Sequence, residues 1–258
     1  MGKIKLIFFI FLLQNTILAQ TIDLSDFVVD SIQLNKSIYP SGNIRKSWQL
    51  YDENESIKVK ELKQWMSQGD SLPYSKDFLS KKFDLTNGKR TIKKVDNGYL
   101  ITYNHGEFRS ALYYLSFDGQ QSYNITPADI RINDFFEFNS KLYAIEGISH
   151  LGMEHGSLIE FYMDKNVWNY KLILNFDEEP EKVFQRGEET FIITTNYILK
   201  LEPDFTLTNV IKSPFQWGIF RPNSAFIIKK NLYIGMNGGI LKIENFEKKP
   251  RYIWYKHK

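Results

Sequence analysis

The sequence has no cysteine, so disulfide bonds, thiolate metal sites and cysteine nucleophiles are excluded, and so is the lipid-modified cysteine of a bacterial lipoprotein. Proline and glycine are sparse, at 8 and 15 of 258 residues, which excludes collagen-like and proline-rich disordered chains. Charge of one sign is not in excess either, since the formal net charge is +3. A nucleic-acid partner would require a clearly basic face and is therefore not expected.

One long apolar run occurs, and it lies at the N-terminus. A basic start is followed by the apolar run Leu6–Leu13 and by Ala19, a small residue before Gln20. Polar residues at 14–16 interrupt the run before it reaches the ~20 apolar residues that a spanning helix needs. This order predicts a signal peptide over residues 1–20 and a periplasmic or secreted mature protein without a stable membrane anchor.

Aromatic side chains are abundant, with 20 Phe, 15 Tyr and 5 Trp. Flat and branched side chains fit the pleated surface of a sheet, so this composition favours strands over helices. With 43% hydrophobic and 24% charged residues, the chain has the composition of a globular protein. An all-β fold is therefore expected.

A strand–turn–strand unit recurs along the chain. Residues 232–243 align without a gap to residues 190–201, and shorter copies begin at Tyr99 and Leu142. The copies begin at residues 99, 142, 190 and 232, so they are spaced by 43, 48 and 42 residues, and each has a further apolar run before and after it. Four short strands at this spacing are typical of a β-propeller blade, although hairpins of any all-β chain could imitate such a period.

We therefore predict an all-β fold: a β-propeller of about five four-stranded blades, in a single domain over residues 21–258. Residues 91–258 contain the four repeats, and residues 21–90 form an irregular N-terminal part. A short helical insertion is expected near the N-terminus at Glu61–Ser67, because Leu62, Trp65 and Met66 have amphipathic spacing. Pro73 then prevents its easy continuation.

The hairpin Leu232–Ile243, with Tyr233-Ile234-Gly235 and Gly238-Gly239, is similar to repeats of bacterial propellers. The segments 106–108 and 146–152 resemble those of an uncharacterised family of exported bacterial proteins, over residues 40–258. This resemblance implies a propeller fold and export. It implies no activity and no catalytic residue.

Complete catalytic motifs are missing from the sequence. The glycines at 235, 238 and 239 lie in a strand turn without a following helix, so they do not form a nucleotide-binding loop. Neither a serine nucleophile elbow nor a His-Glu-x-x-His zinc helix is present. No cofactor and no metal are therefore predicted.

Two turns between the aligned strands are longer than their counterparts, by 5 and 8 residues relative to the last unit. They carry three of the four histidines and several charged residues, and equivalent turns of neighbouring blades would open on one rim. The candidate ligand-binding residues are His105, Glu107, Arg109, His150, Glu154 and His155. The alternative interpretation is that the charged residues pair among themselves and the histidines cap backbone groups.

Two other groups of residues are assigned to structure. Trp217 and Phe220, next to Arg221 and Asn223, resemble a carbohydrate-binding group but are expected to fill the wedge between blades. The charge run at 178–179 is interpreted as solvated loop.

The leading hypothesis is a non-enzymatic exported module that binds a small polar ligand, a glycan or a protein. The alternative is a hydrolase or lyase that acts on a glycan or another extracellular polar substrate, with Glu107, Glu154 and a histidine as acid and base. The absence of a complete catalytic motif favours the binding module.

We predict that the exported protein lacks the first 19 or 20 residues, because the apolar run has the length and the small-residue exit of a signal peptide. Intact-mass measurement on the exported protein tests this. Recovery of unprocessed Met1 in a membrane fraction would contradict it.

Overall fold

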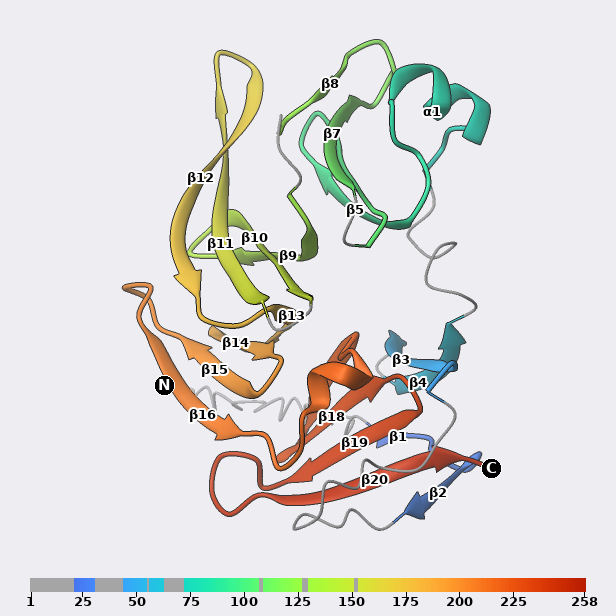
Figure 1. The fold of residues 1–258 in the computed structure, drawn as a ribbon, viewed down its shortest axis with the longest axis vertical. Coiled ribbons are helices and arrows are strands. Elements are labelled where there is room, and N and C mark those ends of the chain that lie inside the picture. The colour runs from blue at the N-terminus through green and yellow to red at the C-terminus, as the bar shows by residue number, and fades with distance from the viewer. Residues whose placement is uncertain are drawn as a thin grey trace, which may run out of the picture.

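The structure is a computed structural model that describes residues 21–30, 44–54, 56–62, 72–106, 109–126, 130–150 and 153–258. The predicted signal peptide lies outside these ranges. Strands predominate in the described residues, and the helical elements are α1 (Lys76–Lys82) and the 3-10 helix η1 (Trp217–Phe220). The strands form five sheets around a common centre (Figure 1), so the predicted β-propeller fold is confirmed.

We number the sheets as blades I to V in chain order, and blades II to V are antiparallel meanders. Blade I contains β1 (Thr21–Ile22), β3 (Ser47–Glu53) and β4 (Ser56–Leu62). Blade II contains β5 (Lys89–Val95), β6 (Gly98–Asn104), β7 (Ser110–Ser116) and β8 (Ser122–Asn124). Blade III contains β9 (Ile132–Phe138), β10 (Lys141–His150), β11 (Met153–Asp164) and β12 (Val167–Phe176). Blade IV contains β13 (Pro180–Arg186), β14 (Glu189–Thr194), β15 (Tyr197–Leu201) and β16 (Leu207–Lys212). Blade V contains β17 (Ser224–Ile228), β18 (Asn231–Met236), β19 (Gly239–Glu244), β20 (Arg251–His257) and β2 (Phe27–Asp30).

The described strands of blades I and V depart from the four-stranded pattern, because the N-terminal segment is divided between them. Its strand β1 pairs in parallel with β4 of blade I, which has three described strands. Its strand β2 pairs antiparallel with β20, placing Phe27 opposite His257, and becomes the fifth strand of blade V. The C-terminal strand β20 is thus joined to β2 of the N-terminal segment in one sheet.

The first strand of each meander lies innermost, so that β5, β9, β13 and β17 are neighbours around the centre and β3 follows β17 (Figure 1). Because consecutive strands alternate in direction, the connections alternate between two rims of the ring. We call the rim that carries the β6–β7, β10–β11, β14–β15 and β18–β19 turns the upper rim. The innermost strands begin at this upper rim and end at the lower rim.

The repeat predicted from the sequence corresponds to equivalent positions in the blades. Tyr143, Phe191 and Tyr233 each lie on the second strand of a blade, opposite a phenylalanine of the first strand. All three are buried, and each packs into the core shared with the following blade. Leu100 has the same place in blade II, in the core shared with blade III. The four repeats are therefore structurally equivalent, as predicted.

The apolar cores lie between adjacent blades, where the face of one sheet covers the face of the next. Blade II is covered on its other face by α1 and the residues that follow it, including Leu79, Phe83 and Leu85. Trp217 and Phe220 of η1 are fully buried in the core between blades IV and V, so their assignment to the wedge between blades is confirmed.

The structure has a short helix near the N-terminus, α1, but the helix predicted at Glu61–Ser67 is contradicted at its first two residues. Glu61 belongs to β4, residues 63–67 lie outside the described ranges, and α1 follows Pro73 instead of preceding it. The Ser75 hydroxyl caps α1 by accepting a hydrogen bond from the Phe78 amide at 3.1 Å. The amphipathic spacing before Gly69 was a weaker signal than this cap and the apolar residues that α1 packs on blade II.

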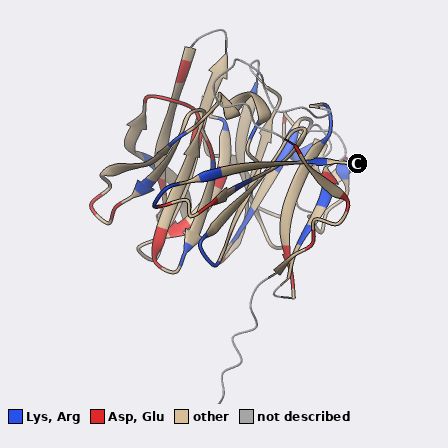
Figure 2. Cartoon of the chain, turned by 90° about the horizontal axis from the view of Figure 1, so that it is seen from below, with Lys and Arg blue, Asp and Glu red and all other residues tan. Residues whose placement is uncertain are grey.

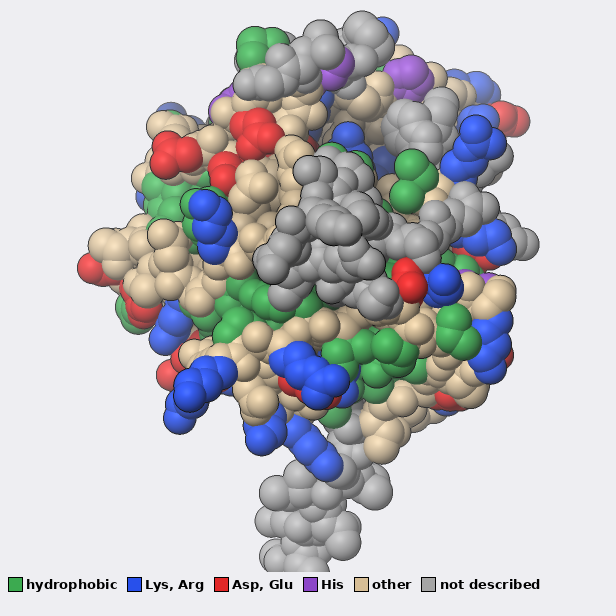
Figure 3. Space-filling view, turned by 60° about the horizontal axis from the view of Figure 1, so that its bottom comes forward, with side chains coloured by type: hydrophobic (Ala, Val, Ile, Leu, Met, Phe, Trp, Pro, Cys, Tyr) green, Lys and Arg blue, Asp and Glu red, His purple; other side chains and the backbone are tan. Residues whose placement is uncertain are grey.

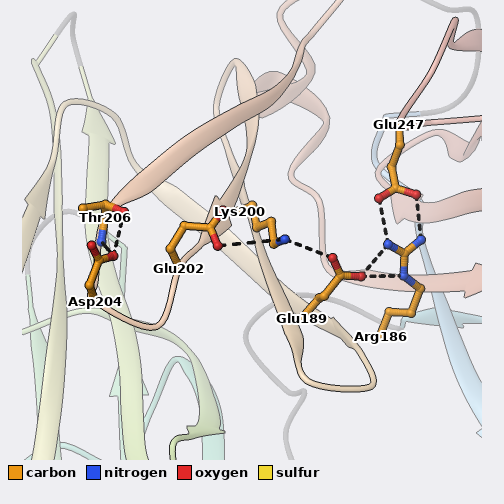
Figure 4. Close-up of polar contacts among 7 residues, drawn as sticks. All are labelled: Arg186, Glu189, Lys200, Glu202, Asp204, Thr206 and Glu247. Atoms are coloured by element: carbon orange, nitrogen blue, oxygen red, sulfur yellow. Dashed lines mark hydrogen bonds and ion pairs between the residues drawn. The ribbon is translucent and has the colours of Figure 1, made fainter.

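Charge pairs tie blade IV to blade V at the lower rim (Figure 4). Arg186, at the end of β13, donates to Glu247 at 2.8 and 2.7 Å and to Glu189 at 2.9 Å, and Lys200 pairs with Glu189 at 3.0 Å. Hydrogen bonds from Arg186 lower the pKa of both carboxyl groups, so both are ionised. The guanidinium also lies 5.6 Å from the centre of the Phe246 ring.

Elsewhere on the surface, basic and acidic side chains are interspersed along the strands and turns (Figure 2). The face in Figure 3 likewise mixes both signs with apolar side chains. None of the helices in the described ranges is long and apolar enough to span a membrane.

We predict that Tyr233→Ala lowers the free energy of unfolding by about 3 kcal/mol, because it leaves a cavity in the core between blades V and I. Tyr162, 40% exposed on the blade III hairpin, is the matched control, and Tyr162→Ala should cost less than about 1 kcal/mol. Urea unfolding of the two variants measures both values. Equal losses would argue against the equivalence of the blades.

Candidate functional site

The residues proposed from the sequence lie on two turns of the upper rim. His105 and Arg109 flank the β6–β7 turn, where the His105 amide donates to the Arg109 carbonyl at 2.9 Å. His150, Glu154 and His155 belong to the β10–β11 hairpin of the next blade. Glu107 lies outside the described residues.

The β10–β11 connection is not the irregular loop that its length suggested. The two strands continue pairing as far as His150 opposite Met153, with Ser149 opposite Glu154 and Ile148 opposite His155. The extra residues therefore lengthen a hairpin, because backbone pairing satisfies their amides and carbonyls more completely than a loop would. Alternation along β11 places Glu154 and His155 on opposite faces, so these two side chains do not form one cluster.

Glu154 is the predicted residue with the most informative contacts. Its carboxylate accepts hydrogen bonds from the Ser149 hydroxyl at 3.1 Å and from the Thr195 hydroxyl of blade IV at 2.9 Å. This second bond joins the upper-rim turns of blades III and IV. Within the described residues, no group of three His, Asp or Glu side chains is arranged to hold a metal ion.

A second polar group lies nearer the centre of the ring, and the sequence analysis did not find it. It comprises Glu179 just before β13, Glu181 and Lys89 near the starts of two innermost strands, and Arg221 directly after η1. We call these four residues the channel cluster. The signal that could have found it is the position of ionisable residues at the upper ends of the innermost strands.

The interpretation of residues 178–179 as solvated loop is wrong, because both make specific contacts inside the ring. Glu178 accepts hydrogen bonds from the Thr194 hydroxyl and the Asn196 amide at 2.6 and 2.9 Å, and it thereby shapes the β14–β15 turn. Its Oε2 also lies 3.1 Å from the Thr195 hydroxyl, whose single proton it shares with Glu154. Glu179 is only 5% exposed. The connection between β12 and β13 is only residues 177–179, and it places these carboxylates against the β14–β15 turn, which sequence polarity alone does not reveal.

Glu179 is buried, and only one of its two carboxylate oxygens has a hydrogen-bond partner among the described residues. Its Oε1 accepts from the Asn133 amide at 3.2 Å, and its own backbone carbonyl accepts from the Thr195 amide at 3.1 Å. Its Oε2 has no hydrogen-bond partner among the described residues. Burial raises the pKa of Glu179, and the Arg221 guanidinium opposes this shift. Burying a carboxylate oxygen without a hydrogen bond is unfavourable, unless a donor from outside the described residues contacts it.

Glu181 is the most strongly perturbed carboxyl of the channel cluster. Burial raises its pKa to about 8, and repulsion from Glu179 contributes in the same direction. Arg221 and Lys89 oppose the shift, and Glu154 adds a smaller repulsion. Glu181 therefore carries a proton near neutral pH, and the predicted residue Glu154 lies at the edge of the same electrostatic group.

The pKa of Lys89 is shifted in the opposite direction to that of Glu181. Burial among the surrounding residues lowers its pKa, and the nearby Lys182 ammonium lowers it further. The side chain is nevertheless accessible to solvent. Lys182 itself pairs with Asp134 at 2.7 Å, whereas Lys89, Glu181 and Arg221 make no side-chain hydrogen bond or ion pair with any described residue. These three side chains interact only at longer range.

Arg221 follows the 3-10 helix η1, which hydrogen bonds attach to blade IV. It caps the end of η1 in a left-handed conformation, with φ of 49°. Trp217 of η1 donates from its indole nitrogen to the Thr194 carbonyl at 2.8 Å, and the Gly218 amide donates to the Thr195 carbonyl at 3.1 Å. A Cβ on Gly218 would come within 2.7 Å of the Thr195 side chain, so only glycine allows this close approach.

A cavity of about 390 Å³ lies along β9 and β13, and none of the four residues of the channel cluster lines it. It is lined by Lys93, Asp134, Phe135, Phe136, Glu137, Lys182, Val183, Phe184 and Gln185. It shares Asp134 and Lys182 with the surroundings of Lys89. Cavities of about 300 to 1,000 Å³ are the usual size of small-molecule sites.

No family model and no curated protein matches the chain. Among solved structures, the extracellular domain of a hybrid two-component system from B. thetaiotaomicron is similar, with 13% identity over 64% of this chain and a TM-score of 0.42. A gluconolactonase from Xanthomonas campestris is similar with 11% identity over 66% of this chain and a TM-score of 0.39. The chain spans 23% and 57% of the lengths of these two proteins, and neither similarity carries an argument about function.

We predict that Glu181→Gln unfolds at a higher temperature than the parent protein at about pH 9 and at the same temperature at about pH 5. Because the pKa of Glu181 is raised to about 8, the folded state keeps a proton that the unfolded state, with a pKa of about 4.3, has lost. Stability therefore falls as the pH rises through this interval, and glutamine removes that loss.

Thermal unfolding across the pH range tests this. Glu188→Gln, at the exposed turn between β13 and β14, is the control and should show no pH-dependent difference. A destabilised Glu181→Gln protein at about pH 9 would mean that the ionised carboxylate has a favourable partner.

Proposed function

We propose that the chain is an exported binding module that takes a small polar ligand at the channel cluster, at the upper ends of the innermost strands. The observation that carries the proposal is the lack of direct partners: Glu179 Oε2, Glu181, Lys89 and Arg221 face one another without a hydrogen bond or ion pair among the described residues. Among these four residues Glu179 is buried and Glu181 is half-buried, whereas the side chains of Lys89 and Arg221 are exposed to solvent. A carboxylate oxygen as deeply buried as Glu179 Oε2 normally has a hydrogen-bond donor.

The lower rim supports this proposal by contrast. At the other end of β13, Arg186 and its carboxylate partners are bonded directly to one another at less than 3 Å. The same strand thus has satisfied charges at one end and unsatisfied charges at the other. A ligand placed among the unsatisfied groups would restore the missing interactions.

Glu154 and the flanking turns extend the proposed site outward. Glu154 is tied to Thr195 and acts electrostatically on Glu181, so we propose it as a residue that shapes the mouth of the site. We keep His105, Glu107, Arg109, His150 and His155 as proposed contacts for the outer part of a larger ligand, because their turns open on the same rim. The periplasmic or secreted location rests on the signal-like N-terminus.

An enzyme acting on a polar extracellular substrate is the second candidate. One observation favours it: the pKa of Glu181 is raised to about 8 and that of Lys89 is lowered, so the two groups titrate closer together than free side chains do. Product formation would distinguish this candidate from simple binding.

We predict that a panel of sugars, sugar acids, amines and amino acids contains at least one compound that stabilises the processed protein. At a concentration of ten times its dissociation constant, a ligand adds about 1.4 kcal/mol, or roughly 3 to 5 °C in the melting temperature. Arg221→Gln and Glu179→Gln should abolish this rise.

Arg251→Gln is the matched control, because Arg251 is exposed on the lower rim and should leave the rise unchanged. Mass spectrometry of the incubated compounds shows whether any is converted. Stabilisation that survives both site variants would place the ligand elsewhere, and no stabilisation by any compound would refute the proposed function.

A further inference from the structure

We propose that Asn87 is a site of spontaneous deamidation, at which the Asn87–Gly88 peptide converts to aspartyl and isoaspartyl forms as the protein ages. The only reagents are this chain and water. The inference goes beyond the proposed function and does not depend on it, since it requires no ligand. It assigns a covalent modification to the segment that connects α1 to the innermost strand β5.

The reaction takes place within one peptide unit. The backbone nitrogen of Gly88, after losing its proton to solvent, attacks the side-chain carbonyl carbon of Asn87. A cyclic succinimide forms and ammonia leaves. Water then opens the ring at either of its two carbonyl groups, which gives aspartate or isoaspartate, and in isoaspartate the main chain runs through the former side chain. A glycine after the asparagine favours the attack, because glycine has no Cβ to obstruct the approach of its nitrogen.

The local structure leaves both reacting groups without hydrogen bonds. Asn87 is exposed, in a connection without regular secondary structure that ends where β5 begins at Lys89. Neither the Asn87 carboxamide nor the Gly88 backbone N–H makes a hydrogen bond with any described residue. Gly88 has a φ of 97°, a conformation that glycine adopts without strain. No contact among the described residues therefore has to be broken before the nitrogen can attack.

Two other asparagines of the chain precede a glycine, and hydrogen bonds hold their reacting groups. The Gly238 amide donates to the Lys46 carbonyl at 2.7 Å, so the nitrogen that would attack Asn237 is engaged. The Asn97 carboxamide oxygen accepts from the Trp168 indole at 3.0 Å. Because one hydrogen bond must break first, we expect deamidation at these two sites to be at least about fivefold slower than at Asn87.

The position of Gly88 gives the modification a structural consequence. A Cβ on Gly88 would lie 2.4 Å from the Asn104 carbonyl oxygen and 3.0 Å from the His105 backbone nitrogen, so this backbone is packed tightly against the start of the β6–β7 turn. Isoaspartate at position 87 inserts an extra methylene group into the main chain beside this contact and must displace one of the two segments. The aspartyl form changes only the charge of an exposed side chain, and it leaves the packing as it is.

The experiment incubates the processed protein at mildly alkaline pH and follows each asparagine by peptide mapping with mass spectrometry. We expect modified Asn87 to accumulate at least about fivefold faster than modified Asn97 or Asn237. The rate should rise with pH, because the attacking nitrogen must lose its proton. In protein unfolded with urea, the three sites should react at similar rates, since each is followed by glycine and no structure protects any of them.

Two variants separate the charge from the altered main chain. Asn87→Asp reproduces the aspartyl form and should melt within roughly 2 °C of the parent protein. Asn87→Gln is the matched control: its longer side chain closes a ring much more slowly, so the incubated variant should remain unmodified. Circular dichroism verifies that both variants fold. In the incubated parent protein, the fraction that an isoaspartyl methyltransferase labels should melt below the Asn87→Asp variant.

Three results would overturn the inference. The first is an equal rate at the three sites of the folded protein, and the second is faster modification at Asn97 or Asn237 than at Asn87. The third is an Asn87 that stays unmodified in the folded protein for as long as the unfolded chain takes to react. An isoaspartyl fraction that melts together with the Asn87→Asp variant would overturn the displacement at the β6–β7 turn.

Discussion

A sheet that is apolar on both faces must be covered on both sides, and this constraint organises the whole chain. Each of blades III, IV and V shares one core with the blade before it and another with the blade after it. Blade II obtains its second cover from α1 and the residues after it, with Leu79 buried in that core. Closure of the blades into a ring, packing of α1 on blade II and burial of Trp217 between blades IV and V all cover apolar faces of the sheets.

Stacking around a centre has a consequence for polar residues. The innermost strands bring their side chains together from several blades, so charges that are far apart in the sequence meet in a confined space. At the lower end of β13, Arg186 finds Glu189 and Glu247 at hydrogen-bond distance, and the result is a bridge between two blades. At the upper end, Glu181 interacts electrostatically with Lys89 and Arg221 but forms no ion pair with either. Burial raises the pKa of Glu181 and lowers that of Lys89.

The difference between the two rims follows from what surrounds each charge. Arg186, Glu189 and Glu247 at the lower rim are 34 to 41% exposed and pair directly, and such partly exposed pairs stabilise the fold only modestly. The groups at the upper rim are held by elements that cannot adjust freely: Glu179 is fixed through Asn133 and Thr195, and Arg221 by the end of η1. Fixed and incompletely satisfied groups are a common property of binding sites.

Periodicity was sufficient to predict the β-propeller, because each blade must repeat the same alternation of buried positions, such as Tyr143, Phe191 and Tyr233. The sequence also pointed to the upper-rim turns and to Glu154, since their extra length is visible in the alignment of the repeats. It misplaced the helix, whose position depends on which face of blade II is left uncovered. It could not identify Glu179, Glu181, Lys89 and Arg221 as one group, because their proximity arises only when three blades and η1 close around a centre. Burial in that confined space raises the pKa values of Glu179 and Glu181 and lowers that of Lys89, which residue type alone does not reveal.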